Sequence, residues 1–364
     1  MCKRLRVGPI AIVRFALAVA GVAVALACAA PSPRSADSTG PAPASPAMGG
    51  PGAAPAQPVP LRVAYSEIYP GNTVPWTAYE AGIFAAHGLD VALSYVPSSQ
   101  TVPAVIANEI DVALGGGYAV INSRLAGSDL KMIFAVVNFY QYELMVSPEV
   151  ASPADLRGKK LGVSRFGSSS DQSTRLLLRL FNLVPDQDVV LVQTGSLQER
   201  VAAMQAGAVA GGLAGPADIP KLRQLGFTSL YDLSKSGQQD LNNVAFASEA
   251  WLADHEAHAQ AFVDALVEAI HYVKTNRAVA QQVLGTYLKL DDPVLLDELH
   301  ERYVGANLAR VPDPGYQATE RYLHEQAETD PRAAAARLND FFDTRFVDRV
   351  NASGLVERLY GSSP

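Results

Sequence analysis

The sequence predicts an α/β protein of two lobes, each built on a parallel sheet with helices on both faces. Short apolar runs alternate with longer helical stretches in residues 61–137, and the same rhythm returns in residues 159–226. The chain has 364 residues and is 49% hydrophobic, which suffices for about two ordinary cores. Two such cycles in one chain indicate two sheets and therefore two lobes.

The first cycle opens with the run LRVAYS at 61–66, which reads as a strand. A helix is predicted over 74–88, ended by Gly88, and DVALSYV at 90–96 is the next strand. The stretches TVPAVIANE, DVALGGG, YAVINSRLAG and LKMIFAVV then repeat the alternation through Val137. We therefore place residues 60–145 in the first lobe.

The second cycle, placed in a second lobe at 146–243, runs from KKLGVS through DVVLVQT and VAGGLAG with helical stretches between them. Two runs flank it, YELMVS (142–147) and NVAFAS (243–248), and we expect them to be crossover strands that act as a hinge. Residues 244–364 would then return to the first lobe. Their helical patterns, such as Phe262, Leu266, Ile270 and Val273, predict a cover of helices on that lobe.

The N-terminal 27 residues have the pattern of an export signal. They carry four basic residues and no acid, followed by a short apolar run from Phe15 to Ala27. The run is short and rich in small residues for a membrane-spanning helix. A cleaved signal peptide over 1–27 is the prediction, and an uncleaved anchor is the alternative.

Cys28 ends the run Val-Ala-Leu-Ala-Cys, which resembles a bacterial lipoprotein box; the alternative is an incidental cysteine in a plain cleavage region. Lipidation of Cys28 would tether the protein to a membrane surface on the periplasmic or outer side. Residues 28–59 are almost entirely Ala, Pro, Ser and Gly, and predict a flexible tether. The only other cysteine is Cys2, so no disulfide is expected.

The charge of the chain argues against nucleic acid as a partner. The first 27 residues hold four of its 29 basic residues, so the remainder has 25 basic and 36 acidic residues, a net charge of −11. Such a surface is a poor match for polyanions. We expect a monomer without a nucleic-acid partner.

Ligands of open parallel sheets bind beyond the carboxyl ends of the strands, so the residues that follow each strand are candidate contacts. After KKLGVS, Ser169 and Gln172 have the spacing of a capping box, and the turn at Gly167, Ser168, Ser169 and Ser170 should open a helix at the cleft edge. Its N–H groups and hydroxyls suit an anion. A pure capping role for the serines remains an equal alternative.

Other strand ends add further candidates. Thr194 follows DVVLVQ, with a second capping box at Ser196 and Glu199. In the first lobe the candidates are the residues after the first, third and fourth strands and an aromatic group near these edges that would suit a flat or apolar body. They are Ser66, Glu67, Tyr69, Trp76, Gly116, Gly117, Tyr118 and Asn138.

A search for catalytic motifs finds none that fits. The pair His255 and His258 is one residue short of the zinc spacing H-E-x-x-H, and the sequence after Gly162 departs from G-x-S-x-G at its last position. The glycine run at 115–117 lacks the spacing of a nucleotide loop. We predict no catalytic residue, no metal and no cofactor, and hence no enzyme.

With these residues in place, the chain resembles the substrate-binding proteins of ABC transporters, in the group that binds sulfonate, nitrate and taurine. The stretches that carry the resemblance run from LRVAYSEIYPGNTVPWTAYEAGIFAAHGLDVAL through IANEIDVALGGGYAVINSRLAG and SPADLRGKKLGVSRFGSSSDQSTRLLL to LQERVAAMQAGAVAGGLAGPADIPKL. The resemblance implies a periplasmic binding protein-like fold whose two lobes close over a small molecule and deliver it to a membrane permease and its ATPase.

The resemblance also implies contacts at the loop from Ser66 to Tyr69, the glycine corner, Asn138 and the serine turn. A proline typical of the group is matched by Pro216, while the acid that accompanies it is displaced to Asp218. The group includes precursor synthases of the thiamine pyrimidine, which use a cysteine-rich motif with histidine and iron; this chain has no cysteine after Cys28. Such an enzyme and a ligand-sensing module are the alternatives to a solute-binding protein. The sequence does not decide whether the ligand is a small anion or an aromatic vitamin precursor.

Overall fold

A computed structural model describes residues 58–305 and 307–361 of the chain. The predicted signal peptide at 1–27, Cys28 and the predicted tether up to residue 57 lie outside the described residues. The last two residues assigned to that tether are described, and Val59 already belongs to the first strand.

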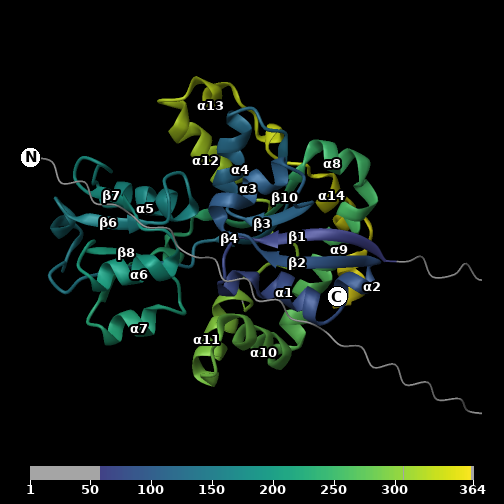
Figure 1. The fold of residues 1–364 in the computed structure, drawn as a ribbon, viewed down its shortest axis with the longest axis horizontal. Coiled ribbons are helices and arrows are strands. Elements are labelled where there is room, and N and C mark those ends of the chain that lie inside the picture. Colours follow the sequence, from purple (N-terminus) through teal and green to yellow (C-terminus); the bar gives the residue numbers. More distant parts are fainter. Residues whose placement is uncertain (1–57, 306, 362–364) are drawn as a thin grey trace, which may run out of the picture. The chain divides into compact units, whose positions relative to one another are not determined.

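Two five-stranded sheets form the framework of the described chain (Figure 1). In the first lobe the strand order is β2-β1-β3-β10-β4, and in the second lobe it is β7-β6-β8-β5-β9. The strands of the first sheet are β1 (Val59–Tyr65), β2 (Leu89–Tyr95), β3 (Val112–Gly115), β4 (Leu130–Phe139) and β10 (Gln239–Ser248). Those of the second sheet are β5 (Glu143–Val146), β6 (Lys160–Val163), β7 (Val190–Gln193), β8 (Gly211–Ala214) and β9 (Thr228–Asp232).

The predicted fold class, two α/β lobes between which the chain crosses twice, is confirmed, with one correction to the sheets. Each sheet is mixed, because β10 runs antiparallel to β3 and β4, and β5 runs antiparallel to β8 and β9. The antiparallel strand of each lobe is the one that enters directly from the other lobe. A chain that crosses between two sheets and returns needs such an entry strand in each of them.

The position of the crossings differs from the prediction. YELMVS forms β5, which pairs within the second sheet, and NVAFAS belongs to β10, which pairs within the first. Both runs are held by ladder hydrogen bonds along their length, so the segments that cross are 140–142 and 233–238. The second sheet therefore begins at Glu143, and the return to the first sheet begins at Gln239.

Strand alternation buries both faces of the first sheet. Val63 and Tyr65 point into a core shared with helices on one side, while Ala64, between them, faces a second core. The helices of the first chain segment are α1 (Thr73–Glu80), α2 (Ile83–Ala86), α3 (Ser98–Ile106) and α4 (Gly117–Leu125). The single helix predicted over 74–88 is two helices, because Gly82 takes a positive φ of 70° that ends the first of them.

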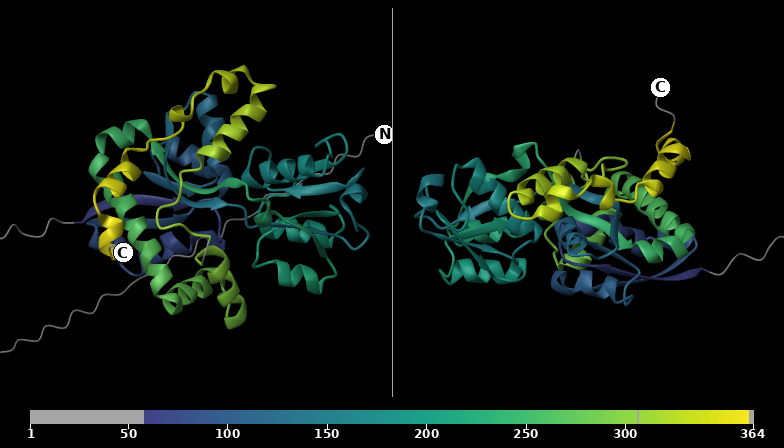
Figure 2. Two further views of the ribbon diagram at one scale, coloured as in Figure 1. Left: turned by 180° about the vertical axis from the view of Figure 1, so that it is seen from behind. Right: turned by 90° about the horizontal axis from the view of Figure 1, so that it is seen from above.

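The C-terminal helices cover the first lobe, as predicted. Phe262, Leu266, Ile270 and Val273 are all fully buried in its larger core. Figures 1 and 2 show these helices around the first lobe, while the second lobe carries helices of its own segment. The C-terminal helices are α8 (Glu249–Asp254), α9 (Glu256–Thr275), α10 (Arg277–Leu288), α11 (Pro293–Tyr303), α12 (Tyr316–Ala327), α13 (Pro331–Ala335), α14 (Arg345–Ala352) and α15 (Leu355–Tyr360).

In the second lobe, helices pack on both faces of the sheet (Figure 1). Helix α5 (Ser169–Leu180) buries Leu177 and Leu178 on one face. Helices α6 (Leu197–Gln205) and α7 (Ile219–Gln224) bury residues such as Met204 on the other. This arrangement brings the N-termini of all three helices to the carboxyl ends of the parallel strands.

Candidate functional site

A cavity of about 180 Å³ lies between the strand ends of the two lobes. The first lobe contributes loop residues after β1 and the corner after β3, and the second contributes the N-terminal regions of its helices. Of the residues predicted from the sequence, the structure brings seven to this cavity. They are Ser66, Glu67, Tyr69, Gly116, Ser168, Ser169 and Ser170.

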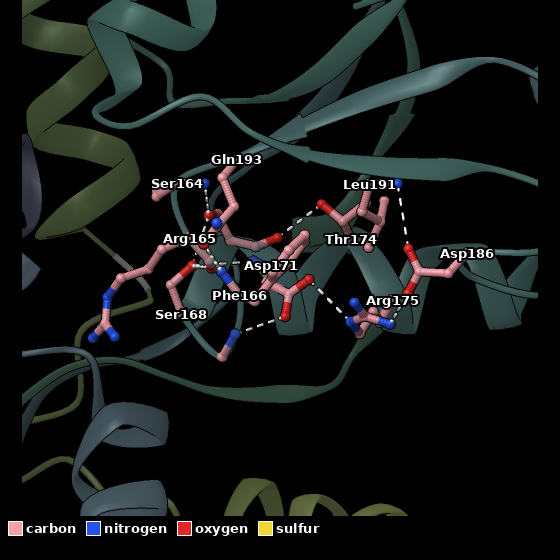
Figure 3. Close-up of polar contacts among 12 residues, drawn as sticks. Ser164, Arg165, Phe166, Ser168, Asp171, Thr174, Arg175, Asp186, Leu191 and Gln193 are labelled. Carbon is pink, nitrogen blue, oxygen red and sulfur yellow. Dashed lines mark hydrogen bonds and ion pairs between the residues drawn. The ribbon is translucent and has the colours of Figure 1, made fainter.

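The serine turn is built by hydrogen bonds within the chain (Figure 3). Ser168 is the N-cap of α5, and its hydroxyl accepts a bond from the Asp171 N–H at 3.4 Å. The Ser170 hydroxyl accepts a bond from the Ser164 N–H at 2.9 Å, which joins the end of β6 to the helix. The predicted capping box of Ser169 with Gln172 is therefore wrong, because the helix is capped one residue earlier.

The Ser169 side chain takes no part in these hydrogen bonds. Its hydroxyl is buried and has no hydrogen-bond partner among the described residues. As the first two residues of α5, Ser169 and Ser170 also present N–H groups for which the helix has no carbonyl. The Ser169 hydroxyl faces Gly116 of the first lobe, where an added Cβ would lie 2.7 Å from it.

Arg200, on α6, is the strongest charged feature of the cavity wall. Its aliphatic stem crosses the second sheet above two glycines, since a Cβ at Gly162 would lie 3.0 Å from its Cγ and one at Gly212 would lie 2.8 Å from its Cδ. Larger residues at these two strand positions would collide with the stem. The glycines of β6 and β8 thus make room for an arginine that reaches the cavity.

The guanidinium of Arg200 is buried with most of its hydrogen-bonding capacity unused. The residue is 3% exposed, and its Nε and Nη1 have no partner among the described residues. Its Nη2 donates to the Ser164 hydroxyl at 3.4 Å. Burial lowers the pKa of Arg200, while nearby Tyr142, Glu67 and Asp218 oppose that shift. An unpaired buried cation costs free energy and is a ready partner for an anion.

Sequence reasoning missed Arg200, although a signal was present. Leu197, Arg200, Val201 and Met204 follow the spacing i, i+3, i+4, i+7 of a core-facing helix stripe. A charged residue in such a stripe either covers a functional cavity or is paired, and Arg200 has no ion-pair partner among the described residues. Arg165 also lines the cavity; Figure 3 shows its side chain extending away from the turn.

Aromatic and apolar residues form much of the remaining wall. Tyr69 of the first lobe packs edge-on against Tyr303 of α11, with ring centroids 6.1 Å apart. Tyr142, at the first crossing, accepts a hydrogen bond of 2.8 Å on its hydroxyl from Asn242 of β10. Tyr142 belongs to the core of the second lobe and also lines the cavity. Leucine side chains from the end of α10 and beyond add apolar surface.

Three of the predicted contacts from the first lobe lie in its cores instead. Trp76 is fully buried and stacks on Tyr287 with ring centroids 4.4 Å apart. Tyr118 packs edge-on against Tyr322 in the smaller core of that lobe. Gly117 faces core side chains, which a Cβ there would approach to about 3 Å. Each of them follows a strand end or loop, but the helix it belongs to turns it inward.

The other four predicted contacts also lie outside the cavity lining. The Asn138 side chain donates to the Asp313 carbonyl at 2.8 Å. The Thr194 hydroxyl donates to the Val163 carbonyl and so serves its own sheet. Gly167 forms the turn with a φ of +77°, and lines a separate groove behind α5. Pro216 is buried, whereas its neighbours Gly215 and Ala217 line the cavity.

Two searches of the described residues bear on other kinds of site. Within residues 58–305 and 307–361 no cluster of three or more metal-ligating side chains is found. In the same part of the chain no helix has the length and apolar character needed to cross a membrane.

Two α/β lobes lie around a central cavity, and each sheet includes one antiparallel strand that enters from the other lobe. This architecture is the periplasmic binding protein-like fold. The chain is similar to the aliphatic sulphonate binding protein SsuA of Escherichia coli at a TM-score of 0.61 and 20% identity, over 75% of this chain and 88% of that one. The alkanesulfonate-binding protein SsuA of Xanthomonas axonopodis bound to MOPS is similar at a TM-score of 0.62 and 17% identity, over 78% of this chain and 96% of that one. The nitrate-binding protein NrtA of Synechocystis PCC 6803 is similar at a TM-score of 0.65 and 14% identity, over 86% of this chain and 93% of that one.

The family follows from the sequence itself. The profile of the family described as NMT1/THI5 like matches residues 72–280, more than half of the chain. The chain belongs to this family, and the predicted resemblance to the sulfonate- and nitrate-binding group is confirmed. No curated protein sequence matches it.

Proposed function

We propose that the protein is a solute-binding protein that captures a small organic anion between its two lobes. The observation that carries the proposal is the buried guanidinium of Arg200, which faces the cavity with two unpartnered nitrogens. The free N–H groups at the start of α5 and the Ser169 hydroxyl lie on the same wall. These donors match the oxygens of a sulfonate or carboxylate group.

The size and the apolar part of the cavity favour an organic ligand over nitrate. Its volume of about 180 Å³ is well above the about 10–15 Å³ of cavity volume that a single water needs. Nitrate, with four heavy atoms, would leave much of this space to water. Aromatic rings such as Tyr69 and Tyr303 would contact the carbon body of a larger anion.

Binding without chemistry is part of the same proposal. The chain has no cysteine after Cys28, so it lacks the cysteine-rich motif expected of the precursor synthases. The charged residues that line the cavity are two arginines, Arg165 and Arg200, and two acids, Glu67 and Asp218; no histidine is among the lining residues. This set holds a ligand by charge and hydrogen bonds.

We further propose that the ligand passes to the permease and ATPase of an ABC importer, and that the protein is held at the membrane through Cys28. The lipoprotein-like run before Cys28 and the Ala, Pro, Ser and Gly composition of residues 28–57 support a tethered module. Mass spectrometry of the mature protein tests the anchor. A diacylated Cys28 as the first residue supports it, and a mature chain that begins elsewhere overturns it.

The binding function is tested by isothermal titration calorimetry of the wild-type protein with alkanesulfonates, arylsulfonates and the matching carboxylates. We expect at least one of these anions to bind with micromolar or tighter affinity and to reduce the radius of gyration in small-angle scattering, because a ligand held by both lobes favours the closed state. Absence of binding across the series would refute the proposal. A new product in the same samples, seen by mass spectrometry, would favour the enzyme alternative.

A further inference from the structure

One helix of the first lobe, α12, contacts the second lobe outside the cavity (Figure 1). Glu325 of α12 forms an ion pair with Arg179 of α5, with Oε2 and Nη2 2.6 Å apart. Near it on α12, Tyr322 donates to the Asn122 side chain of α4 at 2.6 Å, and Asn122 donates to the Gly167 carbonyl of the second lobe at 3.5 Å. The two lobes therefore meet at α12 as well as around the cavity.

The same helix is fixed to the segments that cross between the lobes. Arg321 of α12 donates to the Tyr140 hydroxyl at 3.2 Å, in the first crossing, and to the Gln239 carbonyl at 2.7 Å, directly after the second. It also donates to the side chain of Gln238, the last residue of the second crossing, at 3.1 Å. Helix α12 thus holds both crossings, and about one turn further along it reaches the second lobe through Glu325.

The contact between α12 and α5 is polar, and the two helices belong to different cores. Tyr322 of α12 packs in the smaller core of the first lobe, and Leu177 of α5 packs in a core of the second lobe. No core cluster of residues 58–305 and 307–361 includes side chains of both helices. A groove of about 420 Å³, lined by polar side chains of both, lies beside the ion pair. The lobes can therefore separate at this contact without exposing a core.

Helix α5 links this contact to the cavity. Its first residue, Ser169, lies on the cavity wall, and Arg179 lies in its last turn. The lobes are close together in this structure, since a Cβ at Gly116 of the first lobe would lie 2.7 Å from the Ser169 hydroxyl. A rotation of the second lobe that opens the cavity would carry α5 away from α12, because the apolar face of α12 is buried in the first lobe.

We propose that the ion pair of Arg179 and Glu325 is a latch, which forms only when the lobes are closed and favours closure whichever solute is bound. The pair lies outside the cavity, so it adds the same free energy to the closed form with every ligand. It raises the affinity without changing the ratio of affinities for two ligands. Because its side chains are 41% and 22% exposed, its contribution is that of an exposed ion pair.

Distances between spin labels on the two lobes test the latch without any ligand. Because the sequence has no cysteine besides Cys2 and Cys28, full-length protein with both replaced by serine accepts labels at chosen positions. Glu109→Cys in the first lobe and Gln187→Cys in the second place them at exposed residues. Double electron–electron resonance then measures the ratio of closed to open molecules.

Variants of Glu325 should change this ratio in a graded way. Glu325→Gln should lower it about threefold, the size of effect expected for one exposed ion pair. Glu325→Arg should lower it about tenfold, because Arg179 then faces a like charge. The exchanged pair, Arg179→Glu with Glu325→Arg, should restore the wild-type ratio. Thermal unfolding checks that each variant is folded.

Glu256→Gln is the matched control, because Glu256 pairs with Arg345 and both belong to C-terminal helices of the first lobe. It should leave the distances unchanged. Equal distance distributions in the wild type, Glu325→Gln and Glu325→Arg would overturn the latch. A loss of the closed form that the exchanged pair does not restore would refute the pairing with Arg179.

Calorimetry separates this inference from the proposed function. With ethanesulfonate and toluene-4-sulfonate as probes, Glu325→Gln should weaken the binding of both by the same factor, up to about threefold. A change in the ratio of the two affinities would show that Glu325 acts on the ligand and would overturn the latch. If no organic anion binds, the proposed function fails, and the label distances without ligand still decide whether the latch exists.

Discussion

The two lobes have the same strand order but present different chemistry to the cavity. The second lobe supplies the arginine and the serine turn, whose donors are held by α5 and α6. The first lobe supplies aromatic side chains, the glycine corner and one carboxylate. Equivalent topology brings equivalent strand ends to the cavity, and the side chains at those ends decide what each wall binds. In the proposed function, the second lobe binds the anionic group of the solute and the first lobe encloses the rest of it.

The lobes also differ in how they use a buried charge. Arg200 in the second lobe faces the cavity and has unused donors. Asp240 on β10 of the first lobe is fully buried near the second crossing and is surrounded by Tyr118, Tyr140 and Arg321. In the proposed function the charge of Arg200 binds the ligand, whereas Asp240 lies among protein groups and is expected to affect stability instead.

The largest expected effect concerns the binding of the ligand's anionic group by the second lobe. Arg200→Met keeps the aliphatic stem and removes the guanidinium, so about two charged hydrogen bonds of about 1.5–3 kcal/mol each are lost. We expect the affinity for the best organic anion to fall by about 100-fold or more in calorimetry. The melting temperature should stay the same or rise, because an unpaired buried charge is removed.

Arg157→Met is the matched control for that substitution, since Arg157 lies on the surface of the same lobe and pairs with Asp188. It should leave the affinity unchanged. A variant at Arg200 that binds as tightly as the wild type would show that the guanidinium does not hold the ligand.

The second prediction concerns the buried acid of the first lobe. Burial raises the pKa of Asp240 from 3.8 to about 6. Because the folded-state pKa lies above the unfolded one, the folded protein binds the extra proton between these values, and stability is lost as the pH rises through about 6. This change in the pKa of Asp240 corresponds to about 3 kcal/mol in the free energy of unfolding over the whole titration.

Asp240→Asn removes this titration. The free energy of unfolding of the wild type relative to the variant should therefore decrease by about 2 kcal/mol between about pH 4.5 and about pH 7.5, where most of this titration falls. Urea denaturation of both proteins without ligand measures the difference. A difference that is constant over this range would mean that Asp240 titrates normally.

The third prediction tests how closely the lobes approach each other. A Cβ at Gly116 would lie 2.7 Å from the Ser169 hydroxyl across the cavity, and Gly116 has a φ of −68°, which alanine also adopts. Gly116→Ala should therefore lower ligand affinity about tenfold, or about 1.4 kcal/mol, without lowering the melting temperature. Adding Ser169→Ala should restore part of the loss, and additive losses would contradict the contact.

The smallest effect is expected from the serine turn alone. Ser169→Ala removes one neutral donor, a loss of about 1 kcal/mol or about fivefold in affinity. Ser170→Ala is a different test, because this hydroxyl accepts the Ser164 N–H and holds the turn. It should lower the melting temperature more than Ser169→Ala does. A larger loss of melting temperature for Ser169→Ala than for Ser170→Ala would show that Ser169, and not Ser170, holds the turn.

Local patterns in the sequence determined the two α/β cycles, the return to the first lobe and the serine turn, because strand and helix periodicity is written within short windows. The capping box of Ser196 and Glu199 was predicted and is present. One strand, β9, was missed, and its burial pattern shows no strong alternation that would have revealed it.

The composition of the cavity was decided by the tertiary structure. Whether a residue after a strand faces the cavity or a core depends on the rotation of the helix it enters, which separates Ser169 from Tyr118. Arg200 reaches the cavity only because Gly162 and Gly212, on two other strands, leave space for its stem. Glu67 and Asp218 are 151 positions apart in the chain, and only the closure of two lobes brings them to one cavity. Contacts between distant segments have no local signature, so the sequence predicts where a site lies more readily than which side chains complete it.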